Sequence, residues 1–179
     1  MAEFPQSLIL FLRRFAQAID LINDRLGRAV SLLTIFMVLT QFTLVALRYF
    51  LNINSIALQE SVLYMHATVF LLAAAYTYQQ NGQVRVDIFY QRLSRRSQAL
   101  VNMIGILFFL IPMMVFIFYV SWPYVADSWS IQEGSREAGG LAAVFILKTN
   151  ILVMATLLGM QSLSQFVSEF LFWIGGMET

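Results

Sequence analysis

Long runs without charged residues divide this chain into segments. Four of these runs are mostly apolar, at 29–47, 61–84, 97–126 and 149–168, and further apolar residues at 141–147 lead into the last one. A helix needs about 20 consecutive apolar residues to cross a bilayer. The pattern therefore predicts an all-α membrane protein with four transmembrane helices, at about 28–50, 60–80, 98–122 and 141–172.

Two shorter helices are expected outside these spans. Before the first span, apolar residues recur at spacings of three and four, which is one stripe of a helix: Phe4, Leu8, Phe11, Leu12, Phe15, Ile19, Ile22 and Leu26. This stripe predicts an amphipathic interfacial helix at about 5–26, which lies either on lipid or against another protein. Apolar residues mixed with arginines at 79–98 predict a second, shorter interfacial helix in the loop between the second and third spans.

The composition supports a membrane protein and excludes several other classes. Of the 179 residues, 59% are hydrophobic and 12% are charged, whereas soluble domains carry about 25% charged residues. The mean hydropathy is +0.72. A disordered chain, a basic nucleic-acid-binding protein and an ordinary cytosolic enzyme are therefore excluded. The absence of cysteine excludes disulfides and thiolate chemistry. We expect residues 1–179 to form a single membrane domain.

The distribution of arginine predicts how the chain is oriented, because Lys and Arg accumulate in cytoplasmic loops. Four arginines precede the first span, and four more lie in the loop at 79–98. The loop after the first span has only Arg48 at its edge, and the third loop has Arg136, with Lys148 near the start of the last helix. Both termini are therefore expected in the cytoplasm.

Residues that carry chemistry are sparse. His66 is the one histidine, and the four charge-free runs contain no Asp, Glu, Lys or Arg. Charged residues inside spans usually mark ion or substrate paths, and no phosphate-binding loop, metal-ligand cluster or nucleophile–base set is visible. We therefore expect no enzyme activity, no cofactor and no transport path within this chain. His66 is expected to hydrogen-bond a neighbouring helix rather than to relay protons.

The charged residues at the ends of the spans are the candidate contact residues. Lys148 lies about two turns inside the long last helix, so it either snorkels to the surface or pairs with Glu133 or Glu137. Three arginines, Arg92, Arg95 and Arg96, are candidate contacts for anionic lipid headgroups. The candidate partner-interface or orientation residues are Glu60, Arg85, Asp87, Glu133, Glu137 and Lys148.

Three segments resemble a known family when they are read in order along the chain. They are Leu58-Gln59-Glu60-Ser61 at a helix start, Gly82-Gln83-Val84-Arg85-Val86-Asp87 after that helix, and Glu133 to Leu141 followed by Leu147-Lys148. Together with the four-span plan, they resemble the small membrane subunit, DctQ-type, of TRAP (tripartite ATP-independent periplasmic) transporters. The resemblance covers about residues 28–165.

The resemblance implies a transporter component of the bacterial inner membrane. Such a subunit pairs with a large multi-span permease subunit, which holds the substrate and sodium sites, and a periplasmic substrate-binding protein delivers an organic acid anion. The small subunit is expected to brace the large one and to contact membrane lipids, with no nucleic acid partner. The segments at 84–87 and 133–137 look most like members that handle 2-oxo acids or related carboxylates.

Two other classes of function remain open on the sequence. One is an accessory membrane subunit of a different complex, such as an electron-transfer enzyme. The other is a small self-contained transporter that acts as an oligomer. The partner that co-purifies, and transport by the chain alone, would distinguish these alternatives from a transporter brace.

Overall fold

The computed structural model describes residues 5–84 and 87–175, and every regular element in them is a helix. The helices are α1 (Gln6–Leu51), α2 (Ile56–Gln79), α3 (Asp87–Tyr90), α4 (Arg95–Gly105), the π-helical turn η1 (Ile106–Leu110), α5 (Ile111–Ser130) and α6 (Val144–Gly175). Since α4, η1 and α5 run on without a break, the described chain has four helices that are long and apolar enough to cross a membrane. The all-α class and the four long apolar helices are confirmed.

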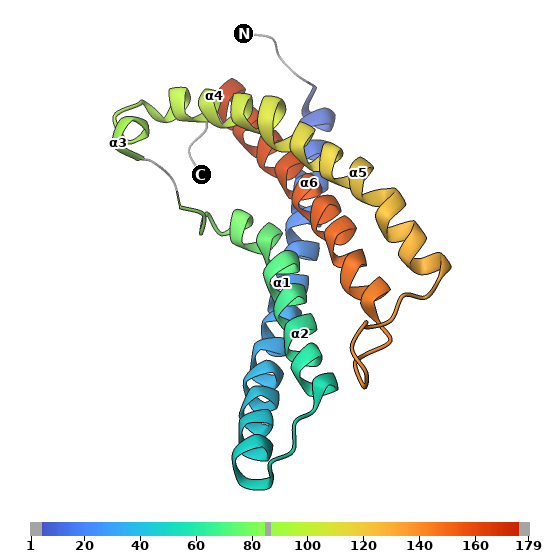
Figure 1. Ribbon diagram of the computed structural model, residues 1–179. Helices are drawn as coiled ribbons and strands as arrows, with labels where there is room; N and C mark the ends of the chain where they lie inside the picture. Colours follow the sequence, from blue (N-terminus) through green and yellow to red (C-terminus); the bar gives the residue numbers. More distant parts are fainter. Residues whose placement is uncertain (1–4, 85–86, 176–179) are drawn as a thin grey trace.

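The long helices form two pairs that diverge from each other. One half of α1 packs along α2, and its other half passes behind α6, while α5 and α6 lie side by side (Figure 1). The first turns of α1 and the last turns of α6 lie at the same end as α4. The 52–55 and 131–143 loops lie toward the other end. Each pair therefore leaves broad outer faces of its helices uncovered by the rest of the chain.

The separate interfacial helix predicted for residues 5–26 is not found. Residues 6–51 form one continuous helix of 46 residues, which is about 69 Å long at 1.5 Å per residue. The helix continues through Gly27, a residue of weak helix propensity, which packs closely against Tyr76 of α2. The stripe that predicted the interfacial helix is also largely exposed, with Phe11 at 66% and Phe15 at 42%.

The face of α1 that is buried instead carries small and polar residues. Ala16, Ile19, Asn23, Gly27 and Val30 are buried, at spacings of three and four. Phe4 of the predicted stripe lies outside the described residues, and of the stripe's described residues only Ile19 belongs to this face. Close approach of helices in a membrane is achieved by small residues and interhelical hydrogen bonds, because lipid is as apolar as leucine. The packing face of α1 is therefore typical of a helix in a membrane rather than of a helix in water.

The second predicted interfacial helix, in the loop between the second and third spans, is not found either. The described residues between α2 and α4 contain one helical turn, α3, and otherwise turns and irregular backbone. Gly82 and Ser94 flank this connection. The Ser94 side chain accepts a hydrogen bond from the Ser97 N–H and caps the start of α4, so a new helix begins at Arg95.

The π-helical turn has a local cause in the sequence. Pro112 lacks an N–H and cannot donate to the carbonyl one turn back. The N–H of Ile111 donates instead to the carbonyl of Ile106, five residues earlier, and the helix continues as α5. A widened turn of this kind lets a proline remain within a long membrane helix.

Candidate functional site

Glu60 anchors the loop that joins α5 to α6. Its Oε1 accepts a hydrogen bond from the Ser135 hydroxyl, and its Oε2 accepts one from the backbone N–H of Leu141 at 2.6 Å. Both carboxylate oxygens are thus used inside the chain. Gly140 permits this contact, because a Cβ there would lie 2.6 Å from Ser135 Cβ and 2.8 Å from Glu60 Oε1. The loop therefore docks on α2 about one turn after the helix start.

Lys148 forms a second anchor of the same loop. Its ammonium pairs with Glu133 and lies 3.9 Å from the ring centroid of Tyr124 on α5, and the Ser128 hydroxyl donates to the same carboxylate at 2.7 Å. The two charged side chains are 14% and 24% exposed. Of the two alternatives that the sequence left open for Lys148, the structure shows the ion pair, with Glu133 as the partner.

This anchor depends on the charge of Glu133 and therefore on pH. Hydrogen bonds from Lys148 and from Ser128 hold the pKa of Glu133 below its usual value of 4.5. A carboxylate with a lowered pKa contributes stability above its unfolded pKa, and that contribution is lost as the pH falls through the folded pKa. The anchor should therefore persist at pH 5 and weaken only below about 4.5.

We expect the Glu133→Gln variant to reveal this pH dependence. The difference in melting temperature between wild type and Glu133→Gln should be constant from pH 7 to pH 5. It should shrink at lower pH, as protonation removes the wild-type charge. Thermal unfolding in detergent, followed by circular dichroism, measures both curves. A difference that grows as the pH falls would contradict the assignment.

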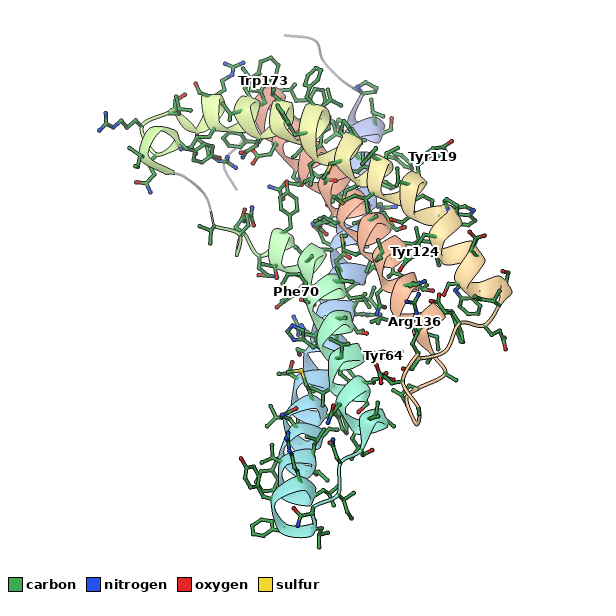
Figure 2. The ribbon with its side chains drawn as sticks, viewed as in Figure 1. Tyr64, Phe70, Tyr119, Tyr124, Arg136 and Trp173 are labelled. Carbon is green, nitrogen blue, oxygen red and sulfur yellow. The ribbon has the colours of Figure 1, made fainter. Side chains whose placement is uncertain are left out.

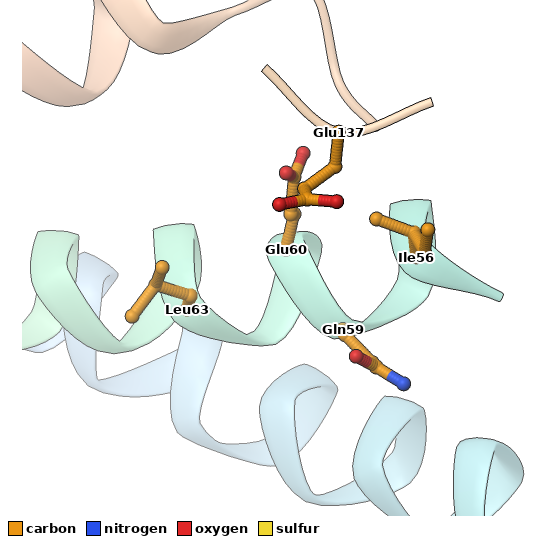
Figure 3. Close-up of a pocket in the computed structure, with 5 residues that line it drawn as sticks. All are labelled: Ile56, Gln59, Glu60, Leu63 and Glu137. Atoms are coloured by element: carbon orange, nitrogen blue, oxygen red, sulfur yellow. The ribbon is translucent and has the colours of Figure 1, made fainter. Parts of the chain in front are cut away.

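Glu60 and Glu137 face one pocket on the outer surface of α2. The pocket has a volume of about 460 Å³ and is lined by Ile56, Gln59, Glu60, Leu63 and Glu137. The Glu137 and Glu60 side chains point toward each other from the loop and from α2, whereas Gln59 points away (Figure 3) and its amide donates to Asn54 Oδ1 at 2.6 Å. Among the described residues no group of acidic or histidine side chains could hold a metal ion.

A buried polar cluster joins α1, α2 and α6. The Gln161 amide donates to Asp20 Oδ1 at 2.8 Å and accepts from the Asn23 amide at 2.6 Å. The Ser164 hydroxyl also donates to Asp20 Oδ1 at 2.8 Å, and the Gln79 amide donates to the Asp20 carbonyl at 3.0 Å. Gln161, Asn23 and Ser164 are almost fully buried. Sequence reasoning missed this cluster, although polar residues concentrate at 161–165 within the apolar run of the last span.

Glu169 forms a third set of contacts, with the start of the third long helix. Its Oε1 accepts from the Asn102 amide at 2.7 Å, and its Oε2 lies 3.2 Å from a guanidinium nitrogen of Arg95. The Tyr90 hydroxyl donates in turn to Asn102 at 3.1 Å. Glu169 is 3% exposed, so its charge is compensated inside the chain. Arg95, a candidate lipid contact on the sequence, is the partner of this carboxylate.

The remaining candidates from the sequence lie apart from these contacts. Arg85 and the side chain of Asp87 fall outside the described residues. Arg92 and Arg96 are exposed. His66 is exposed as well and stacks on Phe70 of the same helix, at 6.4 Å between ring centroids. The interhelical hydrogen bond expected of His66 is absent from the described part of the chain, where Asn150 donates instead to Thr68 of α2 at 2.9 Å.

The fold and these contacts define a small multi-pass membrane protein whose described polar groups mainly bind one another. A family model for the DctQ component of tripartite ATP-independent periplasmic transporters matches residues 37–172. The chain belongs to this family, so it is the small membrane subunit of a TRAP transporter and not an enzyme. The tripartite system implies a large membrane subunit and a periplasmic binding protein as partners. Comparisons with curated proteins and with solved structures found no match.

Proposed function

We propose that this chain braces the large permease subunit of a sodium-driven TRAP transporter in the bacterial inner membrane. The transporter imports an organic acid anion, with 2-oxo acids as the favoured substrate class. The large subunit carries the substrate and sodium sites, and the chain has no ion or substrate path of its own. The uncovered apolar surface of the four long helices is the observation that carries the proposal.

Little of that apolar surface is buried within the chain. In the most apolar stretches of the four helices, the buried share of residues is 6%, 0%, 17% and 17% in chain order. A self-contained four-helix bundle would bury one stripe of every helix in a common core. Here the α1–α2 pair diverges from the α5–α6 pair (Figure 1). An open arrangement of this kind favours a partner that packs along several helices.

The polar side chains also support a bracing role. Asp20, Asn23 and Gln161 hydrogen-bond one another, and Glu169 pairs with Arg95. Polar groups that line a transport path must be free to bind the ion or substrate and release it. Groups that satisfy each other across helices instead hold those helices in fixed positions. A fixed scaffold is what a moving permease subunit needs beside it.

The orientation with both termini in the cytoplasm is part of this proposal. The arginines at 92–96 and the first turns of α1 lie at one end of the molecule, and the 131–143 loop lies toward the other. The excess of arginine at the first end supports a cytoplasmic location. The anchored 131–143 loop then faces the periplasm, where the binding protein delivers its substrate.

Co-purification from native membranes tests the proposed partner. A tagged full-length chain, extracted in mild detergent, should retain a large multi-span permease in stoichiometric amount, identified by mass spectrometry. Recovery of a redox enzyme instead would favour the accessory subunit of an electron-transfer complex. Recovery of a homo-oligomer with no second protein would favour the self-contained transporter. Either result would overturn the proposal.

A matched pair of variants tests whether the anchored loop orients that partner. Glu60→Lys removes both acceptors of the loop, so it should lower recovery of the large subunit about tenfold or more, since 1.4 kcal/mol corresponds to a factor of ten. Gln59→Lys also introduces a lysine, at the neighbouring position, with a charge change of one unit instead of two, and it leaves the Glu60 contacts intact. Equal recovery with both variants would show that the loop does not position the partner.

A further inference from the structure

We propose that the end of the molecule at α4 and the last turn of α6 binds the headgroup of an anionic phospholipid. The contact residues are Arg92, in the turn before α4, and Arg96, in the first turn of α4, beside Trp173 of α6. This proposal does not depend on the transported substrate or on the large subunit.

The structure separates the three neighbouring arginines into two roles. Arg95 pairs with the buried carboxylate of Glu169, and its guanidinium lies 4.8 Å from the ring centroid of Phe172. Its charge is therefore neutralised within the chain. In the described part of the chain, neither Arg92 nor Arg96 pairs with a carboxylate, and both are exposed. Within the described part of the chain, two positive charges therefore remain available to an external anion.

Arg96 is positioned by an aromatic ring. Its guanidinium lies 5.2 Å from the ring centroid of Trp173, which Figure 2 shows at the end of α6 beside α4. A cation over the face of an indole is held by the ring quadrupole. Tryptophan is also enriched at the level of lipid headgroups. Arg96 and Trp173 together are therefore expected to lie at the level of the headgroup phosphates.

The turn that carries Arg92 is held by hydrogen bonds. The Gln98 amide donates to the carbonyls of Tyr90 and Leu93, at 3.1 and 3.3 Å, and the Leu93 N–H donates to the Tyr90 carbonyl at 3.1 Å. These bonds tie the turn back onto α4. Less conformational freedom then has to be lost when Arg92 binds an anion.

The neighbouring surface identifies a lipid rather than a soluble phosphate. Leu93 lies between the two arginines in the sequence and is 40% exposed. Leu100 and Ile104 follow Arg96 at steps of four residues along α4 and are 44% and 47% exposed. A soluble anion would make no use of this apolar surface, whereas acyl chains would cover it. An anionic phospholipid would place its headgroup at Arg92 and Arg96 and its acyl chains along α4. It would then contact both the charged and the apolar part of this surface.

Native mass spectrometry of the full chain in detergent tests this site. We expect phosphatidylglycerol to bind in preference to phosphatidylcholine. Because one basic residue near an anionic lipid surface contributes roughly a fivefold change in binding, the double variant Arg92→Gln/Arg96→Gln should reduce the preference about 30-fold. The double variant Arg92→Lys/Arg96→Lys keeps both charges and should retain most of it, and it guards against misreading a folding defect.

Two single variants provide matched controls. Arg48→Gln removes an exposed charge from the last turn of α1, at the opposite end, and should leave the preference unchanged. Arg95→Gln should lower the melting temperature, because it leaves the buried Glu169 without its cation, whereas Arg92→Gln/Arg96→Gln should not. An unchanged preference in that double variant would overturn the proposal. Glycerol phosphate that binds as tightly as phosphatidylglycerol would overturn the assignment to a lipid.

Discussion

Replacing Gly27 with alanine is expected to force α1 away from α2. A Cβ at this position would lie 2.6 Å from the Cβ and 2.7 Å from the Cδ2 of Tyr76. Atoms at the root of a tyrosine side chain cannot swing aside unless the backbone of α2 moves. Overpacking of this kind costs about 1–3 kcal/mol, and a larger residue such as leucine should prevent the two helices from packing at all.

Thermal unfolding in detergent measures this effect, and the chain offers a close control. Gly105 also lies in the middle of a long helix, but a Cβ there would meet no atom within 4 Å. Gly105→Ala should therefore leave the melting temperature unchanged or raise it, since alanine is the better helix former. A double variant, Gly27→Ala with Tyr76→Ala, should recover part of the stability lost by Gly27→Ala. Equal melting temperatures for Gly27→Ala and Gly105→Ala would contradict the packing described here.

The long apolar helices could be predicted from the sequence because length and lack of charge are sufficient to define them. The all-α class with four long apolar helices is confirmed. The family rested on three short segments instead, and the family model confirms it. The ion pair of Lys148 with Glu133 was one of two alternatives, because a lysine inside an apolar helix must either reach the surface or find a carboxylate. Such features depend on one residue and its immediate chemistry.

The packing face of α1 could not be predicted by the same reasoning. The stripe from Leu8 to Leu26 was identified by the spacing of large apolar side chains, which is a rule for helices in water. By that spacing, Asp20 lies away from the apolar stripe. In the structure, Asp20 accepts hydrogen bonds from Gln161 and Ser164, which lie more than 140 residues along the chain. No local pattern contains that pairing.

Glu169 shows the same limit. Nothing in the local sequence around Glu169 marks it as a buried residue, yet it is 3% exposed and contacts Arg95 and Asn102. The positive charge of Arg95 predicted a contact with lipid headgroups. Which of several neighbouring arginines is neutralised depends on how α6 lies against α4, and that is a property of the tertiary structure.

These interactions support the proposal that the chain acts as a fixed brace. The Glu60 and Lys148 anchors hold the 131–143 loop, the Asp20–Gln161 contacts join α1 to α6, and Glu169 joins α6 to α4. The helices so held leave their apolar faces open to a partner. If the chain is a brace, it is necessary for transport by the complex, but it does not transport substrate by itself.

Uptake into proteoliposomes tests this central claim most directly. The chain, the large subunit that co-purifies with it and a substrate-loaded binding protein are combined in the presence of an inward sodium gradient. We predict uptake of the organic acid anion when all components are present, and only background uptake when either membrane subunit is omitted. Robust uptake by the chain and the binding protein without the large subunit, or full-rate uptake by the large subunit without the chain, would contradict the account.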